Sequence, residues 1–107
     1  MQYEVLLTKN AARDLEELYD YICKYDSTEN AAQVLDAIEN MVVSLRSLPD
    51  RGVYPMELQG LGIREYREIF FKPYRIIYRV TERQVFIYII ADGRRDFRTL
   101  LEQRLLR

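Results

Sequence analysis

Three apolar runs separated by short polar breaks fill residues 63–95, IREYREIFFKPYRIIYRVTERQVFIYIIADGRR. The runs cover residues 64–71, 74–80 and 84–91. Such runs, rich in isoleucine, tyrosine and phenylalanine, are typical of β-strands, and connections this short make neighbouring strands antiparallel. The stretch therefore predicts a three-stranded antiparallel meander.

The middle run separates two kinds of side chain by simple alternation. One face carries the apolar and aromatic members: Tyr74, Ile76, Tyr78 and Val80. The other face carries Arg75 and Arg79 on either side of Ile77. A slip of one residue would bury both arginines, so the pattern fixes the register. Arginines in this position are either solvated or displayed toward an anionic or acidic partner.

The residues before and after the meander predict one more strand and three helices. Residues 3–7 alternate as a strand, and Thr8 is suited to cap a helix that begins near Lys9. A second helix covers residues 31–48, with apolar positions every three or four residues, and a loop follows over residues 50–62.

Asp96 is suited to cap a final helix that extends from Phe97 to about Arg107. The predicted fold is α+β, in the order β-α-α-β-β-β-α. An N-terminal strand and an antiparallel helical hairpin pack on an antiparallel β-sheet. At 107 residues the chain is expected to form a single domain, residues 1–107.

Composition excludes several kinds of chemistry. There is no histidine and one cysteine, Cys23, so we expect no disulfide, no metal site and no cofactor. No apolar stretch is long enough to span a membrane, and residues 1–10 do not resemble a signal peptide, so a soluble, cytoplasmic protein is expected. Residues 1–50 carry four basic and ten acidic side chains, whereas residues 51–107 carry twelve and seven. This charge split predicts a polarised surface or complementary layers within the molecule.

The motifs PYRIIYRV, FIYII and ADGRRDFRTLLEQRLL, with the helical hairpin before them, resemble the RelE/ParE superfamily of toxins from bacterial type II toxin–antitoxin modules. The resemblance covers essentially the whole chain and is closer to the ParE-like branch. It implies one of two activities. RelE-like members are ribosome-dependent ribonucleases, whereas ParE-like members poison DNA gyrase by binding it.

Arg75 and Arg95 occupy positions where RelE-like toxins place two phosphate-stabilising arginines. The positions of a basic pair on the preceding strand hold Tyr66 and Glu68, and that of the catalytic tyrosine holds Leu101. A site with two arginines and no positioned acid or base binds phosphate better than it cuts RNA, since acid–base catalysis contributes about 10²–10⁴ in rate. The resemblance thus favours a gyrase-binding toxin that is not an enzyme.

The alternative is a RelE-like ribosome-dependent mRNA endoribonuclease, in which Arg75 and Arg95 hold the phosphate. Tyr78, Tyr66 or Tyr74 would then supply a hydroxyl, with Glu65 or Glu68 as the base. On the sequence alone the question of enzymatic activity stays open. Arg94 and Arg95 also have a local alternative, in which they pair with Asp92 and Asp96.

Either activity implies a cognate antitoxin, a small DNA-binding protein whose disordered tail folds onto the toxin in a hetero-oligomer. The basic second half of the chain suggests that the tail is acidic with apolar anchors. Eight residues are candidates to contact the antitoxin or the target: Arg64, Arg67, Arg75, Arg79, Arg94, Arg95, Phe97 and Leu101. The apolar side of the last helix either packs on the sheet or awaits a partner.

Overall fold

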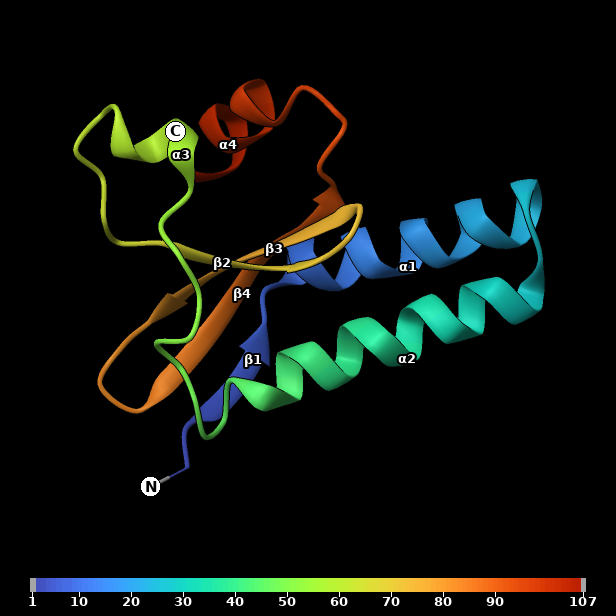
Figure 1. Ribbon diagram of the computed structural model, residues 1–107, viewed down its shortest axis with the longest axis horizontal. Coiled ribbons are helices and arrows are strands. Elements are labelled where there is room, and N and C mark those ends of the chain that lie inside the picture. The colour runs from blue at the N-terminus through green and yellow to red at the C-terminus, as the bar shows by residue number, and fades with distance from the viewer. Residues whose placement is uncertain (1, 107) are drawn as a thin grey trace.

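The computed structural model describes residues 2–106 and has an α+β architecture (Figure 1). The elements are β1 (Glu4–Leu7), α1 (Lys9–Tyr25), α2 (Thr28–Ser44), α3 (Met56–Gln59), β2 (Arg67–Phe71), β3 (Tyr74–Val80), β4 (Gln84–Asp92) and α4 (Phe97–Leu105). The predicted fold class and the predicted order are confirmed, with α3 as an addition. Figure 1 shows the α1–α2 hairpin on one side of the sheet and α3 and α4 on the other.

The four strands lie in the order β1-β4-β3-β2. The meander β2-β3-β4 is antiparallel, as its short turns require. One detail of the prediction differs, because β1 runs parallel to β4 and the sheet is therefore mixed. No tight turn joins these two strands: the helical hairpin and two further strands lie between them, so the connection imposes no antiparallel pairing.

Side-chain caps fix the starts of the three long helices. The hydroxyl of Thr8 accepts a hydrogen bond from the amide of Ala11 at 3.1 Å, as the sequence predicts for the first helix. Ser27 caps α2 in the same way, and the carboxylate of Asp96 caps α4. Each cap satisfies a backbone amide that has no partner within its own helix.

The segment predicted as a loop, residues 50–62, contains the short helix α3, so that prediction is wrong in part. The side chain of Leu58 is buried against the sheet. A helical turn at this point directs Leu58 into that core, which accounts for α3. Strand β2 begins at Arg67, three residues later than predicted, and Tyr66 is buried just before it.

The sheet separates two apolar cores. The hairpin face packs against α1 and α2 through a cluster that includes Ile38, Leu45, Ile76, Tyr78 and Ile87. The opposite face, here called the α4 face, packs against α3 and α4 through Leu58, Tyr66, Ile77, Ile89, Ala91, Phe97, Leu100 and Leu101. The alternation predicted for the middle strand is confirmed, since Ile76 and Tyr78 lie in one core and Ile77 lies in the other.

A register shift between Ile77 and Tyr78 accommodates one extra residue in β4, at Tyr88. This bulge lets Tyr88 and Ile89 both contact the α4 face. Helix α4 ends at Leu105, and Arg107, where the sequence predicts its end, lies outside the described residues. Among residues 2–106 no helix is long and apolar enough to cross a membrane.

Candidate functional site

Arg75 lies at the centre of a charged cluster on the α4 face. Its guanidinium donates four hydrogen bonds, two to Glu57 at 2.8 Å each and two to Glu68 at 2.6 and 3.0 Å. The centre of the guanidinium lies 3.9 Å from the centroid of the Phe97 ring. Only 13% of the Arg75 side chain and 4% of the Glu68 side chain are exposed. The guanidinium of Arg75, on β3, thus contacts residues of α3, β2 and α4.

The electrostatics of this cluster favour the charged forms. Burial alone would lower the pKa of Arg75, but the hydrogen bonds that Arg75 donates to Glu57 and Glu68 outweigh it and raise that pKa. The hydrogen bonds from Arg75 likewise hold the pKa of Glu57 below its usual value. Two carboxyl groups therefore surround one guanidinium.

Gly93 allows Arg75 to reach this position. A β-carbon at residue 93 would lie 2.7 Å from Cδ and 2.9 Å from Cγ of Arg75, closer than carbon atoms approach each other. The stem of Arg75 therefore occupies the space that a side chain at residue 93 would need. From the sequence, Gly93 is expected to close the last strand and is part of the ADGRR motif, but its contact with Arg75 is not predicted.

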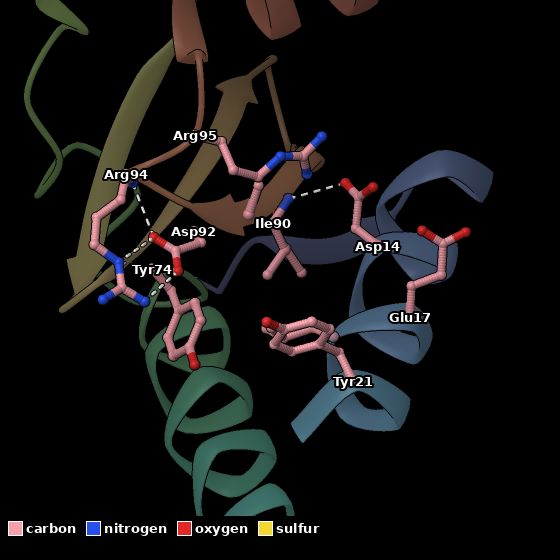
Figure 2. A pocket seen from close by; sticks show the side chains of 10 residues that line it. Asp14, Glu17, Tyr21, Tyr74, Ile90, Asp92, Arg94 and Arg95 are labelled. Carbon is pink, nitrogen blue, oxygen red and sulfur yellow. Dashed lines mark hydrogen bonds and ion pairs between the residues drawn. The ribbon is translucent and has the colours of Figure 1, made fainter. Parts of the chain in front are cut away.

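Arg95 lies elsewhere, over a pocket of about 400 Å³ on the hairpin side of the sheet. Figure 2 shows this pocket between α1, which contributes Asp14, Glu17 and Tyr21, and the segment that follows β4. Arg95 and Tyr74 line its sheet side. The pocket thus brings two arginines, three carboxylates and two aromatic rings together.

Arg94 at the rim of this pocket is held by a local ion pair. Its guanidinium donates to Asp92 at 2.6 Å, and the amide of Arg94 donates to the same carboxylate at 2.8 Å. These bonds lower the pKa of Asp92 and raise the pKa of Arg94. The local alternative predicted for Arg94 is confirmed, while Asp96 caps α4 instead of pairing with Arg95.

The two arginines aligned with phosphate-binding positions are therefore not brought together. Arg75 lies on the α4 face with its donors directed at Glu57 and Glu68, whereas Arg95 lies over the pocket on the hairpin side. Tyr78, the candidate hydroxyl, is fully buried. Its hydroxyl donates to the carbonyl of Pro49 at 2.8 Å and accepts from the amide of Gly52 at 2.9 Å. Burial raises the pKa of Tyr78, which keeps it neutral.

The remaining candidates divide into arginines, of which Arg64 is exposed and Arg67 and Arg79 are partly exposed, and buried apolar residues. Arg64 and Arg67 lie against the ring of Tyr54, with their guanidinium centres 5.9 and 4.7 Å from its centroid. Arg79 pairs loosely with Glu65 at 3.7 Å.

Phe97 and Leu101 are buried in the core of the α4 face, so their side chains are covered in the free chain. Their predicted contact with an antitoxin or target stays a prediction. Within residues 2–106 no group of three or more carboxylate or thiol side chains is arranged to hold a metal ion.

A second buried ion pair, missed by sequence reasoning, ties α4 to the other side of the sheet. Arg104 donates to both carboxylate oxygens of Asp14 on α1, at 3.0 and 2.9 Å, and to the carbonyl of Tyr88 at 2.6 Å. Asp14 also accepts from the amide of Ile90 at 3.1 Å. Strand β1 pairs with β4 only as far as Ile87, and Asp14 and Arg104 bond the backbone of β4 at the residues that follow. A separation of 90 residues leaves no local signal for such a pair.

The mixed sheet, the helical hairpin and the C-terminal helix define a small α+β domain with the architecture of the RelE/ParE toxins. Two solved structures share this fold. The chromosomal ParDE system from P. aeruginosa matches with a TM-score of 0.72 and 20% identity, over 85% of this chain and 96% of that one. The toxin–antitoxin complex RelBE2 from Mycobacterium tuberculosis matches with a TM-score of 0.62 and 21% identity, over 86% and 99%.

Sequence comparisons identify the branch. Toxin ParE3 of Caulobacter vibrioides is 26% identical over 100 residues, which are 94% of this chain and 96% of the relative. The family model for the ParE toxin of the type II toxin–antitoxin system parDE matches residues 5–97. The chain belongs to this ParE toxin family, and it is the toxin of a type II toxin–antitoxin system.

Proposed function

We propose that this toxin inhibits growth by binding and poisoning DNA gyrase and that a cognate antitoxin neutralises it. The observation that carries the proposal is the closure of Arg75 by Glu57 and Glu68. A phosphate at Arg75 would have to displace two carboxylates or bind beside them, and like charges at hydrogen-bond distance repel strongly in a buried site. This arrangement favours a protein-binding activity over RNA cleavage.

The groups that could move protons in RNA cleavage are engaged in other contacts, since the carboxylates of Glu57 and Glu68 are bound to Arg75. The hydroxyl of Tyr78 is occupied by two backbone partners, and the chain has no histidine. Without a positioned acid or base, a rate contribution of about 10²–10⁴ is lost. We therefore propose that the chain is not an enzyme. The alternative is a RelE-like ribosome-dependent endoribonuclease, and the experiments below distinguish it from a gyrase-binding toxin.

The proposed antitoxin is a small DNA-binding protein whose disordered tail folds onto the toxin. Arg64, Arg67 and Arg79 are the arginines proposed to meet an acidic tail, and the ring of Tyr54 lies against the first two. Both structural neighbours come from toxin–antitoxin systems, which supports a hetero-oligomer. Because gyrase acts on chromosomal DNA, the proposed location is the cytoplasm.

The direct test incubates the purified toxin with gyrase, ATP and relaxed plasmid. We expect loss of supercoiling or accumulation of linear plasmid after detergent and protease treatment, which reveals a trapped cleavage complex. Unchanged supercoiling and no linear product at molar excess of toxin would contradict the proposal.

A parallel test with translating ribosomes examines the nuclease alternative. Primer extension on a translated message should give no toxin-dependent stops. Arg95→Ala is the informative variant, because Arg95 is exposed and its removal leaves the core intact. Stops that appear with the wild-type toxin and disappear with this variant would establish the nuclease and overturn the gyrase proposal.

The antitoxin surface has its own charge test. Arg79→Glu should weaken antitoxin binding at low salt and less so at high salt, because exposed charges are screened. Arg83→Glu is the matched control, since Arg83 is an exposed arginine in the turn between β3 and β4. Equal affinity of the two variants at low salt would exclude Arg79 from the interface.

A further inference from the structure

Two tyrosine rings form walls of the pocket between α1 and the segment that follows β4. Tyr21 comes from α1 and Tyr74 from the start of β3, and Figure 2 shows their rings on facing sides of the pocket. Each ring packs against a second aromatic ring outside the pocket: the ring centroids are 4.7 Å apart for Tyr21 and Tyr25 and 6.4 Å apart for Tyr74 and Phe71. Both walls are therefore supported by neighbours before any ligand binds.

The pocket is also large enough and apolar enough for a small molecule. The rest of its apolar lining comes from Leu18, Ile90 and Ala91, of which the last two are buried. Its volume of about 400 Å³ lies within the range of about 300–1,000 Å³ that is usual for small-molecule sites. A flat apolar group placed here would contact the two rings and be removed from water.

Among the described residues that line it, the pocket presents one unpaired charge of each sign. Ion pairs already neutralise the other three charged residues: Asp14, held by Arg104, and Asp92 with Arg94. Within residues 2–106 neither Glu17 nor Arg95 forms an ion pair. Both side chains are exposed, and in Figure 2 the carboxylate of Glu17 and the guanidinium of Arg95 lie above the two rings. A ligand in this pocket thus meets one free carboxylate and one free guanidinium.

We propose that this pocket binds a free aromatic amino acid. The ring of the ligand lies between Tyr21 and Tyr74, whose faces also attract an ammonium group. Its carboxylate accepts two parallel hydrogen bonds from Arg95, and its ammonium group meets the carboxylate of Glu17. A zwitterion matches both free charges of the pocket, whereas a phosphate would be repelled by Glu17 and a simple cation by Arg95.

This contact does not depend on which target the toxin inhibits. Glu17 and Tyr21 lie on α1 and Arg95 follows β4, so the ligand joins the helical hairpin to the segment that leads into α4. A ligand that binds the folded chain and not the unfolded one stabilises the fold by mass action. Occupation of the pocket therefore makes the stability of the toxin follow the supply of free amino acids.

An NMR titration of the intact, isotope-labelled toxin with L-tryptophan tests the proposal. For a ligand of about fifteen non-hydrogen atoms, ordinary ligand efficiency gives a Kd of about 1 mM. The amide signals of Glu17, Tyr21, Ala91 and Arg95 should shift together and saturate, and those of α3 should stay in place. The absence of a saturable shift at about 20 mM ligand, or a shift confined to other residues, would overturn the proposal.

Analogues of the ligand separate its three contacts. Tryptamine lacks the carboxylate and N-acetyl-L-tryptophan lacks the ammonium group, so each should bind about threefold to tenfold more weakly than L-tryptophan. L-Alanine keeps both charges without the ring and should bind at least about tenfold more weakly. N-acetyl-L-tryptophan also resembles the last residue of a protein chain. If it bound as tightly as L-tryptophan, the occupant would be the end of a peptide chain and the proposal would fail.

Matched variants of the intact toxin assign each charge to its partner. Glu17→Gln should weaken binding of L-tryptophan about threefold or more without changing that of N-acetyl-L-tryptophan. Arg95→Gln should weaken binding of L-tryptophan without changing that of tryptamine. Glu16→Gln and Arg98→Gln are the controls, because they change the same charges at exposed positions outside the pocket. Equal losses in the controls would reduce the effect to general electrostatics and refute the site.

Two substitutions of Tyr21 test the aromatic wall. Tyr21→Ala removes a ring that is 62% exposed, so the fold should persist while the affinity for L-tryptophan falls by about fivefold or more. Tyr21→Phe keeps the ring and should bind as the wild type does. The melting temperature of each variant without ligand checks that the fold is intact. A folded Tyr21→Ala variant with unchanged affinity would show that the ring of the ligand does not lie against Tyr21, and the proposal would fail.

Discussion

Arg75→Met should be among the most destabilising single substitutions in this protein. The change keeps an unbranched side chain over Phe97 but leaves Glu57 and Glu68 without their shared cation. Removing one partner of a buried ion pair costs about 3–5 kcal/mol, because a buried charge is left uncompensated. A domain of this size has a free energy of unfolding of about 5–15 kcal/mol. The substitution therefore removes about a fifth of the stability or more.

Urea denaturation followed by circular dichroism at neutral pH measures this loss, and the slope of the transition checks that unfolding remains two-state. The melting temperature should fall by more than about 10 °C. The matched variant adds Glu57→Gln and Glu68→Met to Arg75→Met. It should recover most of the stability, since replacing a whole buried ionic cluster by groups of similar volume is often nearly neutral.

Acid provides an independent check on the cause. Near pH 4 the unpaired carboxyl groups of the single variant take up protons, so its deficit relative to wild type should shrink. A cost of less than about 1 kcal/mol, or a triple variant no more stable than Arg75→Met alone, would refute the view that the cation compensates buried negative charge.

Three further predictions concern the same framework. Arg75 lowers the pKa of Glu57, so Glu57 stabilises the fold at pH values above its usual pKa of 4.5 and loses this contribution as pH falls through the lowered pKa. Glu57→Gln should therefore weaken the loss of stability in acid, measured as the free energy of unfolding against pH. An unchanged pH dependence would contradict the assignment. Gly93→Ala should cost about 1–3 kcal/mol by displacing the stem of Arg75, whereas Gly60→Ala, with open space at its α-carbon, should change the melting temperature little. Arg104→Ala should loosen α4, seen as faster amide hydrogen exchange in residues 97–105 with β2 and β3 unaffected; equal protection in both proteins would remove this ion pair from the forces that hold the helix.

The meander and the hairpin were predictable because their signals are local. The alternation in residues 74–80 and the caps at Thr8 and Asp96 lie within a few residues of the structure they specify. The contact between Arg75 and Glu68 was also within reach. A short turn at residues 72–73 pairs residue 70 with 75 and residue 68 with 77, which places both side chains on one face.

The parts that the sequence did not predict depend on distant segments. Glu57 reaches Arg75 from a loop whose path is decided by the burial of Leu58. The separation of Arg75 and Arg95 also depends on a segment away from β3. Alternation along β3 fixes the face of Arg75, but the turn after β4 decides where Arg95 points. Alignment with the family therefore identified the two arginines in the sequence but did not predict which side chains surround them in the fold.

The parallel pairing of β1 with β4 bears on when the chain becomes a toxin during its synthesis. Glu4 and Gln84 are partners in this pairing, and Gln84 is made 80 residues later. The first strand therefore has no neighbour in the sheet while most of the chain is being translated. The contact between Arg75 and the ring of Phe97 likewise forms only when α4 has been made. Because β4 and α4 are the last elements to be made, the sheet and the core of the α4 face are completed only after residues 84–105 have been translated.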